Sequence, residues 1–264
     1  NAFPRVAPPV NPPAFADACA MENDAFQVGE EVTYKLYYNL NFIWIPAGEA
    51  IFKVAEKDNQ YHLSVVGKTY KSYEWFFKVR DYYDTYVDKE SLLPTLSLRD
   101  VREGGYTVYD RVQFDQLNRQ AIAERGRSKE TIKEYHEIEL DDCMHDILSI
   151  VYFTRNLEYV ELEQAKAIPI KVFMDKETHP LQMRYLGAEA DKKIKGLGSF
   201  NTQVVSPQVI VGDVFKADDQ VKIWVSDDGN RLPLLIESPL SVGSVKAVLK
   251  DYKNLRHDLS AKIE

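Results

Sequence analysis

The segment Val221–Glu237 (VKIWVSDDGNRLPLLIE) constrains the fold most, because two alternating apolar runs flank an Asp-Asp-Gly-Asn turn. Successive side chains of a β-strand point to opposite faces, so Val221, Ile223 and Val225 share one face while Trp224 lies on the other. Alternation on both sides of a short turn is typical of a β-hairpin. The segment therefore predicts two antiparallel strands, each with one apolar face.

The same order of strand, Asp-containing turn, proline and strand occurs again at 88–95 (DKESLLPT) and 175–181 (DKETHPL). Proline has no amide hydrogen to donate within a sheet, which confines it to strand starts and sheet edges. We therefore expect Pro94, Pro180 and Pro233 at the first residues of strands that leave a turn. Three such units in one chain predict a meandering antiparallel sheet.

One long helix is expected over residues 143–156, where Met144, Ile147 and Val151 recur at helical spacing after two aspartates suited to an N-cap. The predicted fold class is mainly β, with a large curved antiparallel sheet or a partly open β-barrel and this helix packed on it. Residues 19–264 would form a single β-rich domain, as two β halves joined by the helix. Residues 1–18 contain five prolines and are expected to form an extended arm.

Charge and hydropathy exclude several classes of protein. The chain has 264 residues and a net charge of −8, which argues against nucleic acid as a partner, because phosphates require a basic surface. No apolar run approaches the roughly 18 residues of a membrane-spanning helix. The first residue, Asn1, is compatible either with a removed secretory signal or with an arbitrary boundary.

The sequence provides no catalytic motif. Its five histidines are scattered without metal-ligand spacing, and Gly196-Leu197-Gly198 lacks the remainder of a dinucleotide fingerprint, which favours a kink in a strand. The acidic pair Asp227-Asp228 is best interpreted as a solvated turn. We therefore expect no catalytic residue, no metal and no cofactor, and a non-enzymatic protein is favoured over an enzyme.

Several segments carry a resemblance to one family: residues 26–30 (FQVGE), 33–50 (TYKLYYNLNFIWIPAGEA), 143–150 (CMHDILSI), 224–228 (WVSDD) and 243–247 (GSVKA). Together with Arg80-Asp81, these segments resemble the domain of unknown function 3108 (DUF3108). The resemblance extends over nearly all of the chain after Cys19. It implies an exported bacterial protein of mostly β structure, and it implies no activity or catalytic residue, because none is assigned to the family.

Export makes a disulfide the expected state of the two cysteines. A protein with two cysteines in an oxidising compartment is expected to pair them, so we predict a disulfide between Cys19 and Cys143. The expected location is the periplasm or the outer cell envelope, with lipid anchoring through the proline-rich arm as an option.

Large aromatic side chains are the remaining clue to function, and two interpretations stay open. Aromatic residues commonly dominate protein cores, which is the simpler interpretation. In the other, Trp44, Trp75, Phe77 and Trp224 line an apolar groove between the helix and the sheet. Such a groove predicts a carrier of a lipid-like or amphipathic molecule. The alternatives are an envelope scaffold protein with an exposed aromatic patch, and thirdly a glycan-active or glycan-binding protein.

Overall fold

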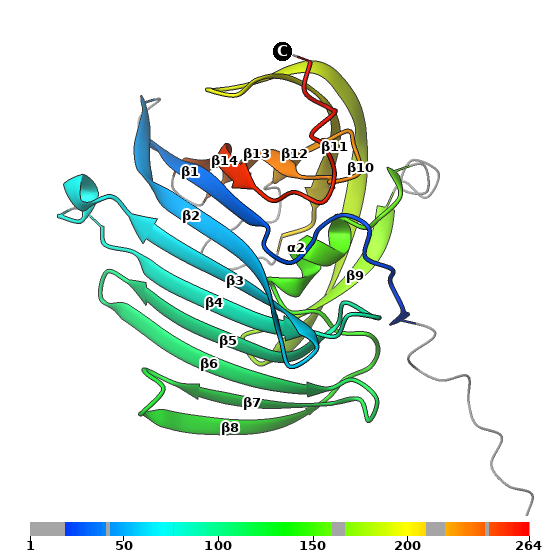
Figure 1. Ribbon diagram of the computed structural model, residues 1–264. Coiled ribbons are helices and arrows are strands. Elements are labelled where there is room, and N and C mark those ends of the chain that lie inside the picture. Colours follow the sequence, from blue (N-terminus) through cyan, green and yellow to red (C-terminus); the bar gives the residue numbers. More distant parts are fainter. Residues whose placement is uncertain are drawn as a thin grey trace, which may run out of the picture.

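The computed structural model of the chain describes residues 19–40, 43–75, 77–159, 167–209, 220–240 and 243–263. Fourteen strands in these residues form one antiparallel sheet in the order β8-β7-β6-β5-β4-β3-β2-β1-β14-β13-β12-β11-β10-β9. The sheet curves strongly around its own concave face (Figure 1). Its two outermost strands, β8 and β9, are not paired with each other, so the sheet remains open.

The strands are β1 (Glu31–Leu40), β2 (Ile43–Lys57), β3 (Gln60–Thr69), β4 (Arg80–Val87), β5 (Pro94–Glu103), β6 (Tyr106–Asp115), β7 (Gln120–Gly126), β8 (Ile132–Glu139), β9 (Ala167–Met174), β10 (Glu177–Ile194), β11 (Gly198–Pro207), β12 (Lys222–Ser226), β13 (Pro233–Pro239) and β14 (Ser244–Lys253). A 3-10 helix, η1 (Lys71–Tyr73), precedes β4, and the short α-helix α2 (Ser149–Thr154) lies between β8 and β9. Because β1 pairs with β14, strands from before and after α2 belong to the same sheet. The expected mainly β, antiparallel architecture is confirmed.

The repeated turns reverse the chain in two different ways. Asp88 Oδ1 accepts from the amides of Glu90 (3.0 Å) and Ser91 (2.9 Å) before β5. The β9–β10 turn instead consists of Asp175 and Lys176, which have φ of 52° and 68°. Positive φ at both central residues is the requirement of the tightest hairpin turn. Local bonding by Asp88 therefore fixes the turn before β5, whereas backbone conformation fixes the β9–β10 turn.

The prolines of these turns lie near strand starts. Pro94 and Pro233 are the first residues of β5 and β13, as expected. Pro180 is instead the fourth residue of β10, in the part that pairs with β9 but not with β11. At this position β10 has only β9 as a neighbour, so no hydrogen bond to a strand on its other side is lost through the missing amide hydrogen.

The predicted helix 143–156 is wrong in its first half, because α2 begins only at Ser149. Residues 143–146 are not helical, and His145 forms a parallel bridge with Val172 of β9. The start of the helix is set at Asp146, whose Oδ1 accepts from the Ser149 amide (2.8 Å) while Ser149 Oγ accepts from the Asp146 amide (3.0 Å). This reciprocal pair takes the place of the two upstream aspartates that the sequence suggests as caps.

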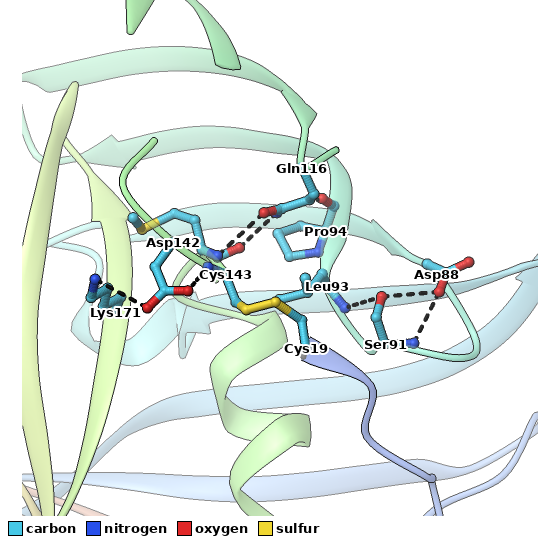
Figure 2. Close-up of a disulfide and its surroundings, with 10 residues drawn as sticks. Cys19, Asp88, Ser91, Leu93, Pro94, Gln116, Asp142, Cys143 and Lys171 are labelled. Atoms are coloured by element: carbon cyan, nitrogen blue, oxygen red, sulfur yellow. Dashed lines mark hydrogen bonds and ion pairs between the residues drawn. A yellow bond between two sulfur atoms is a disulfide. The ribbon is translucent and has the colours of Figure 1, made fainter. Parts of the chain in front are cut away.

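A disulfide joins Cys19 to Cys143 with a Cα–Cα distance of 5.9 Å, and it is the pair expected from the sequence (Figure 2). The Gln116 side chain donates to the Met144 carbonyl (2.8 Å) and accepts from its amide (3.2 Å), which holds the segment after Cys143 extended. The described chain therefore begins fixed to the segment that leads into α2.

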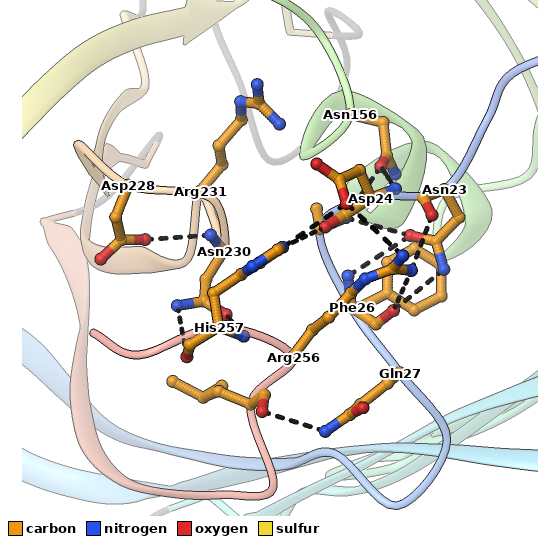
Figure 3. Close-up of polar contacts among 12 residues, drawn as sticks. Asn23, Asp24, Phe26, Gln27, Asn156, Asp228, Asn230, Arg231, Arg256 and His257 are labelled. Atoms are coloured by element: carbon orange, nitrogen blue, oxygen red, sulfur yellow. Dashed lines mark hydrogen bonds and ion pairs between the residues drawn. The ribbon is translucent and has the colours of Figure 1, made fainter. Parts of the chain in front are cut away.

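Residues 19–30, α2 and the C-terminal residues 254–263 gather at one end of the strands, here called the closed end (Figure 3). Asn156 Oδ1, just after α2, accepts from the amide of Asp24 (2.8 Å). Arg256 Nη1 donates to the Asn23 carbonyl (2.7 Å), and the Asn230 side chain accepts from the His257 amide (3.0 Å). Three segments that are distant in sequence are thus bonded into one polar cap over this end.

The opposite end of the strands, here called the open end, carries the β1–β2, β3–β4 and β5–β6 connections (Figure 1). At this end β1 runs to Leu40 and β2 begins at Ile43. Trp44 is accordingly a strand residue, paired with Asn39.

Candidate ligand-binding cavity

A cavity of about 860 Å³ lies between α2 and the strands β9 to β13. Each of the strands β9 to β12 contributes alternate residues to its wall, as a strand with one face toward the cavity must. These residues are Ile170, Val172 and Met174 from β9, Leu181 and Met183 from β10, Val205 and Pro207 from β11, and Ile223 and Val225 from β12, with Val221 just before it. The strand wall is therefore aliphatic.

The helix supplies the opposite side. Ile150, Val151 and Thr154 line the cavity from one face of α2, and Ile147 joins them from the turn just before it. The buried residues Leu148 and Tyr152 lie on the other face, where they pack against β2 to β4 together with Phe26. The helix thus separates a filled core from an unfilled cavity.

The charged groups of the wall are already paired within the described residues. Arg155 binds Glu30 (2.6 Å), and Arg231 binds Glu158 (2.5 Å). Burial alone would lower the pKa of Arg155, but the Glu30 carboxylate outweighs it and raises that pKa above its usual value. The cavity therefore offers apolar surface without an unpaired ion at its closed end.

A second charged cluster lies where β9 turns into β10. Asp175 accepts hydrogen bonds from Arg99 (2.5 Å) and Arg125 (2.6 Å), and both arginines also bind Asp110. Burial alone would raise the pKa of Asp175, but the two guanidinium groups lower it below the usual value. This cluster joins the β9–β10 turn to β5, β6 and β7 by side chains, although β8 and β9 do not pair.

Two buried titratable groups near α2 stay outside the cavity wall. Burial lowers the pKa of His145 to about 3, so its ring is neutral at physiological pH. Its Nδ1 lies 3.2 Å from Ser149 Oγ. Asp146 Oδ2 accepts from the hydroxyls of Thr85 and Ser97, both at 2.6 Å. Both groups are satisfied by neighbours that hold the helix in place, which identifies them as structural residues.

Asp142 lies within 4.8 Å of both cysteine sulfurs, which gathers three potential metal-ligating side chains. The sulfurs are joined to each other and therefore supply no thiolate to a metal. Asp142 accepts from the Cys143 amide (2.9 Å) and pairs with Lys171 (3.3 Å) (Figure 2). These contacts account for the carboxylate, and the cluster is a structural one.

The four aromatic residues proposed from the sequence do not form one site, and none is among the residues that line the cavity. Trp224 is buried on the other face of β12, where Nε1 donates to Glu189 (2.6 Å) and Lys192 covers its ring. Trp44, Trp75 and Phe77 lie at the open end. The cavity described here therefore has a mainly aliphatic strand wall that contains none of these four residues.

The alternation of Val221, Ile223 and Val225 already separates these residues from Trp224, and all three line the cavity. This pattern was the signal that could have identified the wall. It does not distinguish a strand face that is covered by other side chains from one that is not.

A strongly curved, open antiparallel sheet around an apolar cavity defines the class of protein, and the comparisons agree with it. The chain matches the family described as "Protein of unknown function (DUF3108)" over residues 33–250, and it belongs to that family. No curated protein matches the chain. Among solved structures, it is similar to a β-barrel-like protein of domain of unknown function DUF1849 from Brucella abortus, with a TM-score of 0.59 and 9% sequence identity.

That likeness covers 87% of this chain and 99% of the Brucella abortus chain, and at such low identity it concerns the fold alone. In the part of the chain that the structure describes, no helix has the length and apolar character needed to cross a membrane. The disulfide fits an exported protein, because such bonds persist in oxidising compartments.

Proposed function

We propose that this protein binds an amphipathic, lipid-like molecule whose acyl chain occupies the cavity beneath α2. The observation that carries the proposal is an aliphatic cavity of about 860 Å³, within the range of about 300–1,000 Å³ typical of ligand sites. Water in contact with an aliphatic wall is unfavourable, and an acyl chain would remove that contact at no cost in hydrogen bonds.

The charges of the wall favour an acyl chain over a polar ligand. Arg155 and Arg231 already bind Glu30 and Glu158, so a buried anionic group would have to compete with existing partners. The exposed Tyr106 at the open end also lines the cavity, which leaves a route for a polar head group toward solvent. We infer a ligand held by burial of its chain, in a protein of the periplasm or outer envelope, with anchoring through residues 1–18 as a further expectation.

Filling the cavity tests this proposal. In the Leu181→Trp variant, the indole would occupy the wall of the cavity, whereas the matched Gln182→Trp places the same ring on the exposed opposite face of β10. Binding is measured by fluorescence titration with cis-parinaric acid and by native mass spectrometry of protein purified gently from its host. We expect wild type and Gln182→Trp to bind alike and Leu181→Trp to bind at least about tenfold more weakly. Equal binding by the two variants, or none by the wild type, contradicts the proposal.

A second candidate function, an envelope scaffold protein, is favoured by one observation. Trp75 is 83% exposed and Phe77 is 47% exposed, and large rings on a surface commonly mark an interaction site. Recovery of one stoichiometric partner protein by crosslinking in the native envelope, with no bound lipid, would favour the scaffold over the carrier.

A further inference from the structure

The open end carries exposed apolar side chains on three connections of the sheet, those between β1 and β2, β3 and β4, and β5 and β6. Ile43 and Trp44 begin β2, Trp75 and Phe77 lie between η1 and β4, and Tyr106 begins β6. Their exposed fractions run from 36% for Trp44 to 83% for Trp75. In an up-and-down sheet, the first, third and fifth connections necessarily lie at the same end, which is the left side of Figure 1.

Backbone hydrogen bonds hold these connections against one another. The Tyr70 amide donates to the Ala47 carbonyl (2.9 Å), which ties the η1 segment to β2. The Gly104 amide donates to the Lys78 carbonyl (2.8 Å), which ties the same segment to the β5–β6 turn. The aromatic rings thus project from a connected edge that is built before any partner binds.

The charge of this edge differs from that of the chain as a whole, whose net charge is −8. The η1 segment carries Lys71 and Lys78, and its one acid, Glu74, is paired with Arg80. Lys246 lies over the Trp44 ring, with Nζ 4.4 Å from its centroid. Lys246 itself pairs with Glu237 (2.8 Å), so the excess positive charge around the rings is that of Lys71 and Lys78 against the single carboxylate of Glu103.

We propose that this open end docks on the surface of an anionic lipid bilayer, with Trp75 and Phe77 at the level of the head groups. Trp and Tyr concentrate at membrane–water interfaces because their rings have an apolar body and a polar edge, and nearby lysines are attracted to anionic lipid. Tyr106 belongs both to this edge and to the cavity wall, so docking would place the mouth of the cavity against lipid. The docking itself does not depend on the cavity binding a ligand.

Co-sedimentation with vesicles of phosphatidylethanolamine, with and without phosphatidylglycerol, tests the proposal on the full chain. The Trp75→Gln/Phe77→Gln double variant is compared with Leu117→Gln. Leu117 is 71% exposed in the β6–β7 turn at the closed end and therefore serves as a matched control. We expect wild type and Leu117→Gln to bind alike and to prefer phosphatidylglycerol. The double variant should bind about tenfold more weakly, which corresponds to about 1.4 kcal/mol.

Trp75→Phe gives a second measurement that is independent of folding defects. It should retain most of the binding while it loses the part of the quenching of tryptophan fluorescence by bromine-labelled lipid that comes from Trp75, leaving only that of Trp44. The proposal is overturned if the wild type ignores both vesicles, or if Leu117→Gln and the double variant lose binding equally. It is also overturned if sedimentation velocity shows that the wild type and Leu117→Gln are dimers while the double variant is a monomer, because the edge then binds a second copy of the chain. Binding of cis-parinaric acid by the double variant should be unchanged, which separates this test from that of the cavity.

Discussion

Arg155 and Glu30 form a buried ion pair that spans 125 residues of sequence, with Nη1 2.6 Å from Oε1 and Nη2 3.0 Å from Oε2. Arg155 also donates to the carbonyls of Ala25 (3.0 Å) and Asn230 (3.1 Å). One guanidinium group therefore joins the segment before β1, the end of α2 and the β12–β13 turn. It forms the closed end of the cavity and determines where the helix lies over the sheet.

Glu30→Gln is expected to destabilise the protein by about 3–5 kcal/mol, because it leaves the Arg155 charge buried without a counter-ion. Urea unfolding followed by circular dichroism measures the change. The neighbouring Glu31→Gln is the control, since Glu31 pairs with the exposed Lys53 at the surface and should cost less than about 1 kcal/mol. Equal midpoints for the two variants would contradict the role assigned to Arg155.

Loss of the disulfide should destabilise the protein by up to about 4–5 kcal/mol, because its loop spans 124 residues. Unfolding midpoints of the wild type, with and without reductant, are compared with those of the Cys19→Ser/Cys143→Ser double variant. Reductant should lower the midpoint of the wild type and leave the double variant unchanged. Labelling of both cysteines by a thiol reagent in unreduced, unfolded protein would show that the bond is absent.

The contribution of Asp81 to stability should fall as the pH rises from about 4 to about 6. Burial, with a smaller contribution from Glu103, raises the pKa of this carboxyl to about 6. The folded state therefore binds the proton more tightly than the unfolded state does. The protonated carboxyl stabilises the fold at low pH, and that contribution, at most about 3 kcal/mol, is lost through this window.

The variant Asp81→Asn should remove this pH dependence. Its amide oxygen can still accept the Arg102 amide, which donates to Asp81 Oδ1 at 3.1 Å. At pH 7.5 the variant should be as stable as the wild type or more so, by thermal unfolding measured between pH 4 and 7.5. A variant that is strongly destabilised at every pH would show that the charged carboxylate is the stabilising form.

The strands were predictable because alternation and turn chemistry are local. Val221, Ile223 and Val225 face one way in the structure as the sequence requires, and Asp88 fixes its turn through contacts within three residues. The disulfide followed from the count of cysteines together with the expected export. These features need no knowledge of how distant segments meet.

The helix start and the cavity were not predictable, because both depend on contacts between distant residues. Met144 is held extended by Gln116, and His145 is held by Val172 of β9, so the helix cannot begin at the preceding aspartates. An aliphatic strand face gives the same sequence pattern whether other side chains cover it or it lines a cavity. The curvature of the sheet and the position of α2, which Arg155 sets, determine whether that face is covered.

A last prediction concerns Gly48 in β2, which lies beside the anchor of the η1 segment at Ala47. A Cβ atom at Gly48 would collide with the carbonyl oxygen of Lys68 on β3, and backbone cannot move aside as a flexible side chain can. Gly48→Ala is therefore expected to cost about 1–3 kcal/mol.

The control for this prediction is Gly67→Ala, one strand away in the same pair of strands. Its nearest neighbour would be Asp81 Cβ at 3.8 Å, which is ordinary van der Waals contact. We expect Gly67→Ala to be neutral or to stabilise by about 0.4–1 kcal/mol, because it restricts the unfolded chain. Because the Tyr70 amide bonds to Ala47, Gly48→Ala should also weaken vesicle binding, whereas Gly67→Ala should not. Unfolding midpoints and co-sedimentation of the two variants decide the point, and equal behaviour would mean that the close approach of β2 to β3 is relieved at no cost.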